Sequence, residues 1–215
     1  MTKLLRTLAL PTVLVGSLAL ASCGSSDPSA GSDAGPGATG MTTSAPPATG
    51  APATGVKNAS DVTFATDMIP HHAQSVEMAD MAPKQASDPK VKALAAKVKQ
   101  AQAPEIARMS GWLTGWGAPI PGTAGGHDMS GMAGTGADGM MSSKQMTDLG
   151  KATNSAFDRM WLQAMVQHHE GAVTMAKTEL AQGVNPDAKK LAQSIIDSQS
   201  TEIAEMKSVL AKIPG

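Results

Sequence analysis

The chain carries one pattern twice without a gap, and this repeat restricts the fold more than any other feature of the sequence. His168 lies 97 positions after His71, and the strings "MIPHHAQSVEMA" and "MVQHHEGAVTMA" share the histidine pair and both methionines. Chance would not keep such residues in order, so the repeat predicts two copies of one structural unit. The same offset relates Asp61 to Asp158, Met68 to Met165, His72 to His169, Met78 to Met175, Pro89 to Pro186, Gln102 to Gln199, Glu105 to Glu202 and Met109 to Met206.

Each half of the repeat predicts two helices. A capping residue followed by proline, Asp88-Pro89 in one half and Asn185-Pro186 in the other, marks the start of the second helix. We expect the first helices over residues 60–81 and 154–182. Two helical hairpins predict an all-α fold, an antiparallel four-helix bundle whose halves are joined by a long connection at residues 117–142.

Three residues indicate where these helices should break or end. Pro70 lacks a backbone donor, so we expect it to kink or interrupt the first helix. Pro104 raises the same expectation for the second helix. Gly183 is typical of a helix C-terminus.

The composition favours helices and excludes one class of partner. Tyr is absent, and only 2 Phe and 3 Trp are present, so the core must consist mostly of Ala, Leu, Ile, Val and Met. Ala and Met are good helix formers. The formal net charge of −1 gives no electrostatic basis for binding nucleic acid.

The first residues predict an export signal. Lys3 and Arg6 precede an apolar run that ends at "LASC", which is similar to a bacterial lipoprotein cleavage site with Cys23 as the lipidated residue. The alternative is a secretory signal cleaved nearby. We therefore expect a lipoprotein signal peptide over residues 1–22, a Gly-, Ala-, Ser-, Thr- and Pro-rich tether over 23–56, and the folded domain over 57–214. The protein would lie outside the cytoplasm, held at the membrane by its lipid.

The repeated motif places polar side chains on the inner face of the bundle. At 100° per residue, Met68, His71, His72 and Met78 share one helical face, whereas Glu170 in the second motif points away from it. The second motif gives the matching set of Met165, His168, His169 and Met175, and the paired helices add two stripes, Gln102, Glu105 and Met109 with Gln199, Glu202 and Met206. Buried imidazoles need partners, since an unpaired polar group costs about 1–3 kcal/mol.

A metal ion is the partner that we expect. Imidazole with thioether, and no thiolate because Cys23 is the only cysteine, suits copper and Cu(I) in particular. Methionine is more often core filler, and Glu105 and Glu202 offer structural hydrogen bonds to the histidines. One Gly-rich run cannot form a core, so core filling does not explain its methionines. This run holds further metal candidates: His127, Met129, Met132, Met140 and Met141.

A di-iron or di-manganese oxidase centre is the enzymatic alternative. Such centres in four-helix bundles use carboxylates and Glu-x-x-His motifs. Here Met165 and Met68 stand where the glutamates belong, three residues before His168 and His71. The oxidase survives only if four carboxylates, Asp61, Asp158, Glu105 and Glu202, converge on the histidines.

These residues resemble a known family. "DMIPHHAQSVEMA", "FDRMWLQAMVQHHEGAVTMA" and "QAQAPEIARMSGWL" are similar to the bacterial domain of unknown function 305 family, over essentially residues 57–214. The resemblance implies a ferritin-like four-helix fold that is usually exported, with copper binding and copper tolerance in some members. The family's motif falls on Met68, His71, His72 and Met78, and on Asp158, Met165, His168, His169 and Met175.

The sequence thus predicts an envelope lipoprotein that binds copper for buffering, storage or transfer, without catalysis. Metal donor or acceptor proteins are the expected partners, besides the membrane. An interaction or scaffolding module with purely structural histidines is the alternative from another class.

Overall fold

The computed structural model describes residues 55–122 and 139–213, and all regular secondary structure in these two ranges is helical. The predicted all-α class is therefore confirmed. Residues 1–54, including Cys23, the signal peptide and nearly all of the tether, lie outside the described residues, as do His127, Met129 and Met132. The helices are α1 (Ala59–Gln85), α2 (Pro89–Gly115), α3 (Ser143–Lys151), α4 (Asn154–Gln182) and α5 (Pro186–Leu210).

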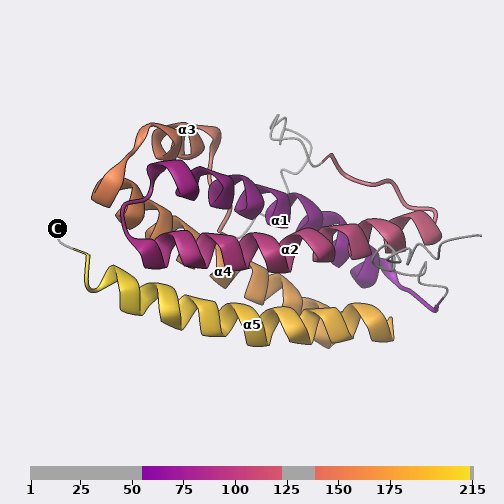
Figure 1. Cartoon of the computed structure of the whole chain (residues 1–215). Helices are drawn as coiled ribbons and strands as arrows, with labels where there is room; N and C mark the ends of the chain where they lie inside the picture. The colour runs from indigo at the N-terminus through magenta and orange to yellow at the C-terminus, as the bar shows by residue number, and fades with distance from the viewer. Residues whose placement is uncertain (1–54, 123–138, 214–215) are drawn as a thin grey trace, which may run out of the picture. The chain divides into compact units, whose positions relative to one another are not determined.

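Four long helices form the predicted bundle from two hairpins (Figure 1). α1 packs along α2, α4 packs along α5, and the hairpins meet mainly through α1 and α4, while α2 and α5 make few direct contacts. Contacts between α1 and α4 show that these two helices are antiparallel, because Ser75 bonds Met165 and the later Met78 bonds the earlier Trp161. α1 and α4 are thus the central pair of the bundle.

The helix starts follow the predicted chemistry. The side chains of Asp88 and Asn185 accept hydrogen bonds from the first turns of α2 and α5, each of which begins with proline. Asn58 caps α1 in a reciprocal capping box with Asp61. These caps satisfy backbone N–H groups that a helix cannot pair internally.

The prolines do not interrupt the helices. α1 runs without interruption through Pro70 and Pro83, and α2 runs through Pro104. Pro70 has buried neighbours, Ile69 and His71, that pack inside the bundle. Tertiary packing of α1 on two neighbouring helices therefore outweighs the loss of one backbone hydrogen bond, which is a local effect.

The short helix α3 was not predicted from the sequence. Ser142 and Gln145 form a capping box at its start, and this Ser-x-x-Gln spacing is the signal that would have predicted it. At its other end, Gln85 of α1 donates to the carbonyl oxygens of Gly150 and Ala152 at 2.7 and 2.9 Å. α3 is thereby fixed to the end of α1.

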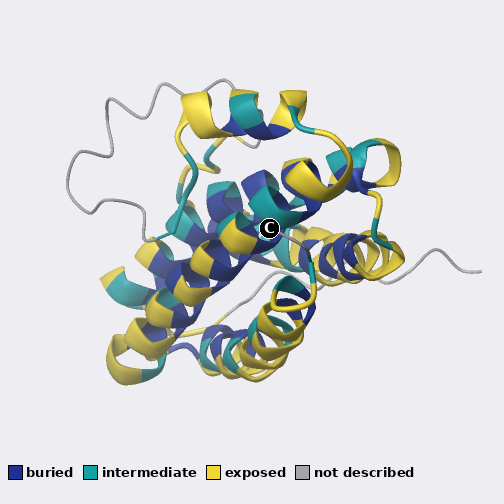
Figure 2. Cartoon of the chain, turned by 90° about the vertical axis from the view of Figure 1, so that its left-hand side faces the viewer, coloured by how far each residue is buried: buried dark blue, intermediate teal, exposed yellow. Residues whose placement is uncertain are grey.

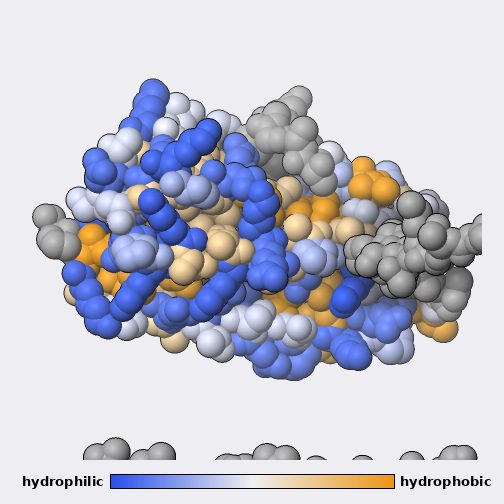
Figure 3. Space-filling model, viewed as in Figure 1, coloured by the Kyte–Doolittle hydropathy of each residue, from blue (hydrophilic) through white to orange (hydrophobic). Residues whose placement is uncertain are grey.

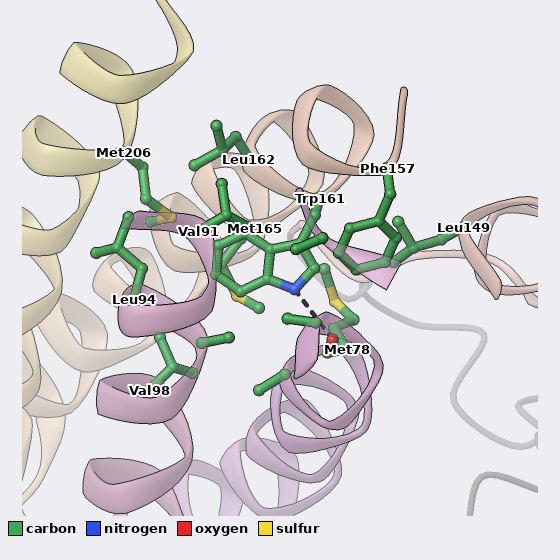
Figure 4. Packing of buried hydrophobic residues seen from close by; sticks show 14 of the residues in the cluster. Met78, Val91, Leu94, Val98, Leu149, Phe157, Trp161, Leu162, Met165 and Met206 are labelled. Atoms are coloured by element: carbon green, nitrogen blue, oxygen red, sulfur yellow. Dashed lines mark hydrogen bonds between the residues drawn. The ribbon is translucent and has the colours of Figure 1, made fainter. Parts of the chain in front are cut away.

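The interior consists of two hydrophobic clusters, and buried residues line the centre of the bundle when it is viewed end-on (Figure 2). In the first cluster Trp161 lies among side chains of α2, α4 and α5 and donates from its indole nitrogen to the carbonyl oxygen of Met78 at 3.0 Å (Figure 4). The first cluster includes Met78, Val91, Leu94, Val98, Leu149, Phe157, Trp161, Leu162, Met165 and Met206. The second includes Phe64, Ala65, Met68, Ile69, Met109, Trp112, Leu113, Ala172, Ala176, Ala188, Leu191 and Ile195.

The 97-residue offset exchanges the two clusters. Met206 and Leu94 belong to the first, and their counterparts Met109 and Leu191 belong to the second. The four histidines belong to neither cluster and lie along α1 and α4 between Met68 and Met78, and between Met165 and Met175. The bundle therefore has two apolar ends and a polar centre.

The surface of the bundle is mostly polar. Hydrophilic residues cover most of the face in Figure 3, and hydrophobic residues reach it only in small separate areas. Among the described helices, none has an apolar stretch of the length needed to cross a bilayer.

Candidate metal-binding site

His71 and His168 are in contact where α1 crosses α4. Their ring centroids are 3.7 Å apart with a 41° angle between the planes, and both side chains are buried. The ring of His72 lies 6.5 Å from that of His71. The structure therefore brings together the two histidines that the repeat relates to each other.

The second histidine of each motif bonds a glutamate on the neighbouring helix. His72 Nε2 lies 2.7 Å from Glu105 Oε2 on α2, and His169 Nε2 lies 2.8 Å from Glu202 Oε2 on α5. A carboxylate only accepts, so Nε2 carries the proton in each bond, and in the neutral form of the ring the lone pair is on Nδ1. Within the described residues neither Nδ1 atom has a hydrogen-bond partner. Both Nδ1 atoms are therefore buried and are candidate ligands for a metal.

His168 has the least satisfied ring. Neither of its ring nitrogens has a hydrogen-bond partner among the described residues, although the side chain is completely buried. Burial lowers the pKa of His168 well below its ordinary value, and the charges of His71, His169 and His72 would lower it further. The ring is therefore neutral at physiological pH, which is the state that coordinates a metal.

Two glutamines add to the polar centre. Gln102 and Gln199 are buried on α2 and α5, one turn before Glu105 and Glu202. No donor in the described part of the chain reaches either side-chain oxygen. Native interiors rarely leave several polar atoms unpaired, so the polar centre is a candidate ligand site.

The candidate methionines do not gather at one point. Met165 and Met68 lie one turn from His168 and His71, but Met165 packs in the first cluster and Met68 in the second. The hydroxyl of Ser75 donates to Met165 Sδ at 3.2 Å. The remaining four pack at the two ends as core residues, Met78 and Met206 in the first cluster and Met109 and Met175 in the second.

Asp61 and Asp158 do not converge on the histidines, as an oxidase centre would require. Asp61 accepts from the backbone N–H groups of Val184 and Asn185, and Asp158 accepts from those of Ser87 and Asp88. Each aspartate lies ten residues before a histidine, about 15 Å along the helix. Their contacts tie one hairpin to the other at the ends of the bundle.

Glu170 is correctly predicted to face away. It is exposed, and its carboxylate pairs with Lys207 at 2.7 Å on the surface. It takes no part in the polar centre.

The last residues of the Met-rich connection lie against the central helices. Gln74 of α1 holds Met141 through two hydrogen bonds, one to its N–H and one to its carbonyl oxygen, both at 2.8 Å. Gly139 has a φ of +83°, and a Cβ atom there would lie 2.9 Å from His168 Cα and closer to Gln167 O. Met140 lies between these two contacts and is half-buried.

Gln74 is a residue that the sequence analysis missed. It falls outside the predicted inner face of α1 but is buried, because the Gly139–Met141 segment covers it. Its counterpart in the second half is Gly171, which has no side chain to make such bonds. Nothing in the helical periodicity could show which outer face the connection covers.

The donor set is unlike a carboxylate metal centre. In residues 55–122 and 139–213, no three His, Cys, Asp and Glu side chains are placed to hold an ion together. Methionines, whose thioethers hard metals bind poorly, stand three residues before His71 and His168 in the sequence. What the fold and this centre define is a helical bundle with a histidine- and methionine-containing interior.

The sequence assigns that bundle to a family. Residues 61–210 match the family described as Domain of unknown function (DUF305), and the chain belongs to it. The predicted resemblance is thus confirmed.

Solved structures of this family share the fold. A secreted DUF305 protein from Streptomyces coelicolor is 33% identical with a TM-score of 0.63, over 71% of this chain and 93% of its own. CopM in its Cu(II)-bound form is 35% identical with a TM-score of 0.59, over 70% of this chain and 95% of its own. CopM has also been solved in a Cu(I)-bound form, which is 33% identical with a TM-score of 0.57, over 72% and 98% of the two chains.

A curated relative matches a shorter stretch. Protein L153 of Acanthamoeba polyphaga mimivirus is 43% identical over 53 residues, which is 25% of this chain and 35% of the viral protein. The chain therefore spans about a third of that relative.

Proposed function

We propose that the protein binds copper at the paired histidines in the centre of the bundle. The observation that carries this proposal is the contact between His71 and His168, with both ring nitrogens of His168 buried and lacking a hydrogen-bond partner in the described residues. A metal ion would satisfy a nitrogen that the described side chains leave unpaired. CopM, which shares the fold at 35% identity, binds copper.

The glutamates support a ligand role for His72 and His169. A histidine that binds metal usually donates its other ring N–H to a carboxylate, which fixes the tautomer and the ring orientation. Glu105 does this for His72, and Glu202 does it for His169. Each pair then directs the Nδ1 lone pair away from the glutamate.

Cu(I) is the form that we favour for the bound ion. The site is buried, Met68 and Met165 lie one helical turn from His71 and His168, and a soft thioether selects Cu(I) over hard ions. Thioethers do not titrate, so a site that uses them keeps copper at a pH where imidazoles alone would release it.

The Met-rich connection is a proposed route for the metal. Met140 and Met141 lie in the segment that Gly139 and Gln74 hold against the central helices. Copper bound by methionines of this connection would be passed toward the histidines. Copper-donating or copper-accepting proteins would then be the partners.

We place this activity in the cell envelope. A structural relative is described as a secreted protein. The "LASC" motif supports lipid attachment at Cys23, so the bundle would be held at the membrane by a lipid and the residues before α1. Copper buffering, storage or transfer requires no turnover, so we propose that the protein is not an enzyme.

The hydrogen bonds of the histidines and carboxylates also bear on the two alternatives, an oxidase centre and a purely structural role. An oxidase centre would need four carboxylates at the histidines, but only Glu105 and Glu202 lie there, and both aspartates bond backbone groups elsewhere. A purely structural role fits the two histidine–glutamate bonds. It does not account for the unpaired ring of His168.

The test is a Cu(I) titration of the full chain without oxygen, against a competing chelator. Cys23→Ser removes the only thiol from the background. Replacing His71, His72, His168 and His169 together by Ala is expected to abolish tight binding, and unchanged stoichiometry and affinity would refute the site. Elemental analysis of protein from metal-replete cells separates copper from the iron or manganese of an oxidase.

A further inference from the structure

One end of the bundle contains a carboxyl pair that the proposed copper site does not use. Asp61 near the start of α1 accepts hydrogen bonds from the backbone N–H groups of Asn58, Val184 and Asn185 at 2.6, 3.0 and 2.8 Å. These bonds join the start of α1 to the connection between α4 and α5. Glu179 of α4 is buried beside Asp61.

The opposite end shows the same arrangement with different chemistry. Asp158 accepts from the backbone N–H groups of Ser87 and Asp88 at 3.1 and 2.9 Å, and also from the Ser87 hydroxyl. Ser87 and Asp88 lie 97 positions before Val184 and Asn185. Asp158 therefore receives a side-chain hydrogen bond that Val184 cannot give to Asp61.

The carboxyl group of Glu179 can supply the side-chain hydrogen bond that Val184 cannot give to Asp61. Its counterpart in the first half is Ala82, so the carboxyl group is present only at the Asp61 end. Among the described residues no N–H or hydroxyl group donates to either Glu179 oxygen. The Glu179 carboxyl lies against Gly183, and Asp61 accepts from the N–H of the next residue, Val184, so the two carboxyl groups are close together. Two ionised carboxylates repel each other and cannot hydrogen-bond, whereas one that carries a proton can donate to the other.

Gly183 provides the space for this carboxyl. Its backbone has φ −68° and ψ 157°, almost the same as its counterpart Ala86 at φ −72° and ψ 142°, so the conformation does not require glycine. A Cβ atom at position 183 would lie 2.7 Å from Glu179 Oε2 and closer still to two other atoms of the carboxyl. Gly183 caps the C-terminus of α4 as predicted, and the absence of its side chain leaves room for the Glu179 carboxyl.

We propose that Glu179 is a protonated carboxylic acid at neutral pH and that its proton, donated to Asp61, replaces the Ser87 hydroxyl and makes this end of the bundle a pH-sensitive latch. The latch holds the segment that enters the bundle, because Asn185 Nδ2 donates to the carbonyl oxygen of Val56 and Asn58 Nδ2 donates to that of Gln182. Loss of the proton places two negative charges together in a buried position.

The charged groups around Glu179 agree with this assignment. Burial and, to a smaller extent, the neighbouring carboxylate of Asp61 raise the pKa of Glu179 to about 8, and the charge of Lys189 of α5 opposes them. Burial also raises the pKa of Asp61, but the hydrogen bonds from Asn185, Asn58, Glu179 and Val184 together lower it. Asp61 is therefore the ionised member of the pair.

The direction of the pH effect follows from the raised pKa. The folded state holds a proton that the unfolded state releases above about pH 4.5, so the stabilisation is complete below that value. This stabilisation decreases as the pH rises toward about 8, and above about pH 8 it decreases no further. Over this window the unfolding equilibrium constant should increase by up to about tenfold per pH unit.

The test replaces residues at the Asp61 end of the bundle by their counterparts from the Asp158 end. Glu179→Ala, Gly183→Ala and Val184→Ser, introduced together in the full chain, reproduce Ala82, Ala86 and Ser87. Denaturant unfolding is measured between about pH 6 and pH 9 with a chelator present, so the result does not depend on copper. The unfolding equilibrium constant of the wild type should increase across this range. The increase in the triple variant should be smaller by a factor of about ten or more.

Glu179→Gln is the second variant, because the amide donates to Asp61 without titrating. It should fold and show the reduced pH dependence of the triple variant. The infrared band of a protonated carboxyl at neutral pH should be present in the wild type and absent from Glu179→Gln. Equal pH dependence of wild type and Glu179→Gln, or the absence of that band from the wild type, would overturn the proposal.

Discussion

The imidazole rings of His71 and His168 are in contact, with their centroids 3.7 Å apart. These two residues occupy the same position in the two halves of the repeat. The contact therefore forms where the halves meet, between two apolar clusters. Two protonated rings would repel each other at this distance. The pairing requires at least one neutral ring, and a neutral ring offers a lone pair to a metal.

The first prediction concerns the stability of the metal-free protein at acidic pH. Because burial lowers the pKa of His168 in the folded protein, the unfolded chain takes up a proton below about pH 6.5 that the folded chain refuses. The metal-free protein should lose stability as the pH falls below that value, by up to about 1.4 kcal/mol per pH unit for one proton. Denaturant unfolding at several pH values measures this. His168→Gln should show a weaker dependence, and an unchanged one would contradict the assignment.

The second prediction concerns the glutamates that orient the outer histidines. Glu105→Ala or Glu202→Ala leaves the Nε2–H of His72 or His169 without its partner. We expect a loss of about 1–3 kcal/mol in the free energy of unfolding. We also expect copper affinity to fall by about 10–100-fold, measured by chelator competition.

Glu170→Ala is the matched control for these two variants. Glu170 is in the same motif but forms only an exposed ion pair with Lys207. Its removal should cost less than about 1 kcal/mol and leave copper affinity unchanged. An effect on affinity as large as that of Glu202→Ala would argue against a specific role for the buried pairs.

The third prediction concerns the segment that covers α1. Gln74→Leu removes both hydrogen bonds to Met141, and Gly139→Ala places a Cβ atom against the α4 backbone at an unfavourable φ. Each change should cost about 1–3 kcal/mol and speed limited proteolysis near Gly139. Gln163→Leu, at an exposed position of α4, is the control. Cleavage at the wild-type rate in both variants would show that this segment is not held.

The fourth prediction uses the repeat itself. Trp161 of the first cluster corresponds to Phe64 of the second, so Trp161→Phe restores the residue of the other half. The variant loses the bond to Met78 and part of the buried ring, for about 1–3 kcal/mol in thermal or denaturant unfolding. Trp116→Phe should cost less, since no acceptor among the described residues meets its indole nitrogen. The opposite ranking would contradict the packing in Figure 4.

The sequence predicted the parts of the fold that depend on periodicity and capping. The starts of α2 and α5 follow from Asp88-Pro89 and Asn185-Pro186, and the inward histidines follow from the 3.6-residue period. The breaks expected at Pro70 and Pro104 failed because tertiary packing outweighs a local propensity. Gln74 was missed because its burial depends on a connection that the periodicity of α1 does not describe.

The candidate site was predicted in part for a similar reason. The offset identified His71 and His168 as equivalent, and the helical stripe brought Glu105 near His72. Asp61 shares a helix with His71, but its partners are backbone N–H groups at the other hairpin's turn. Only the packing of the two hairpins shows that such a residue joins helices and is not part of the polar centre.

The most direct measurement is the affinity of Cu(I) for a variant that lacks only the central pair. His71→Ala with His168→Ala, compared with the wild type by anaerobic chelator competition, should weaken binding by about 100-fold or more. His127→Ala removes a histidine of the Met-rich connection and should leave the tight site intact. Tight binding of undiminished affinity and stoichiometry in the double variant would contradict the assignment of copper to the paired histidines.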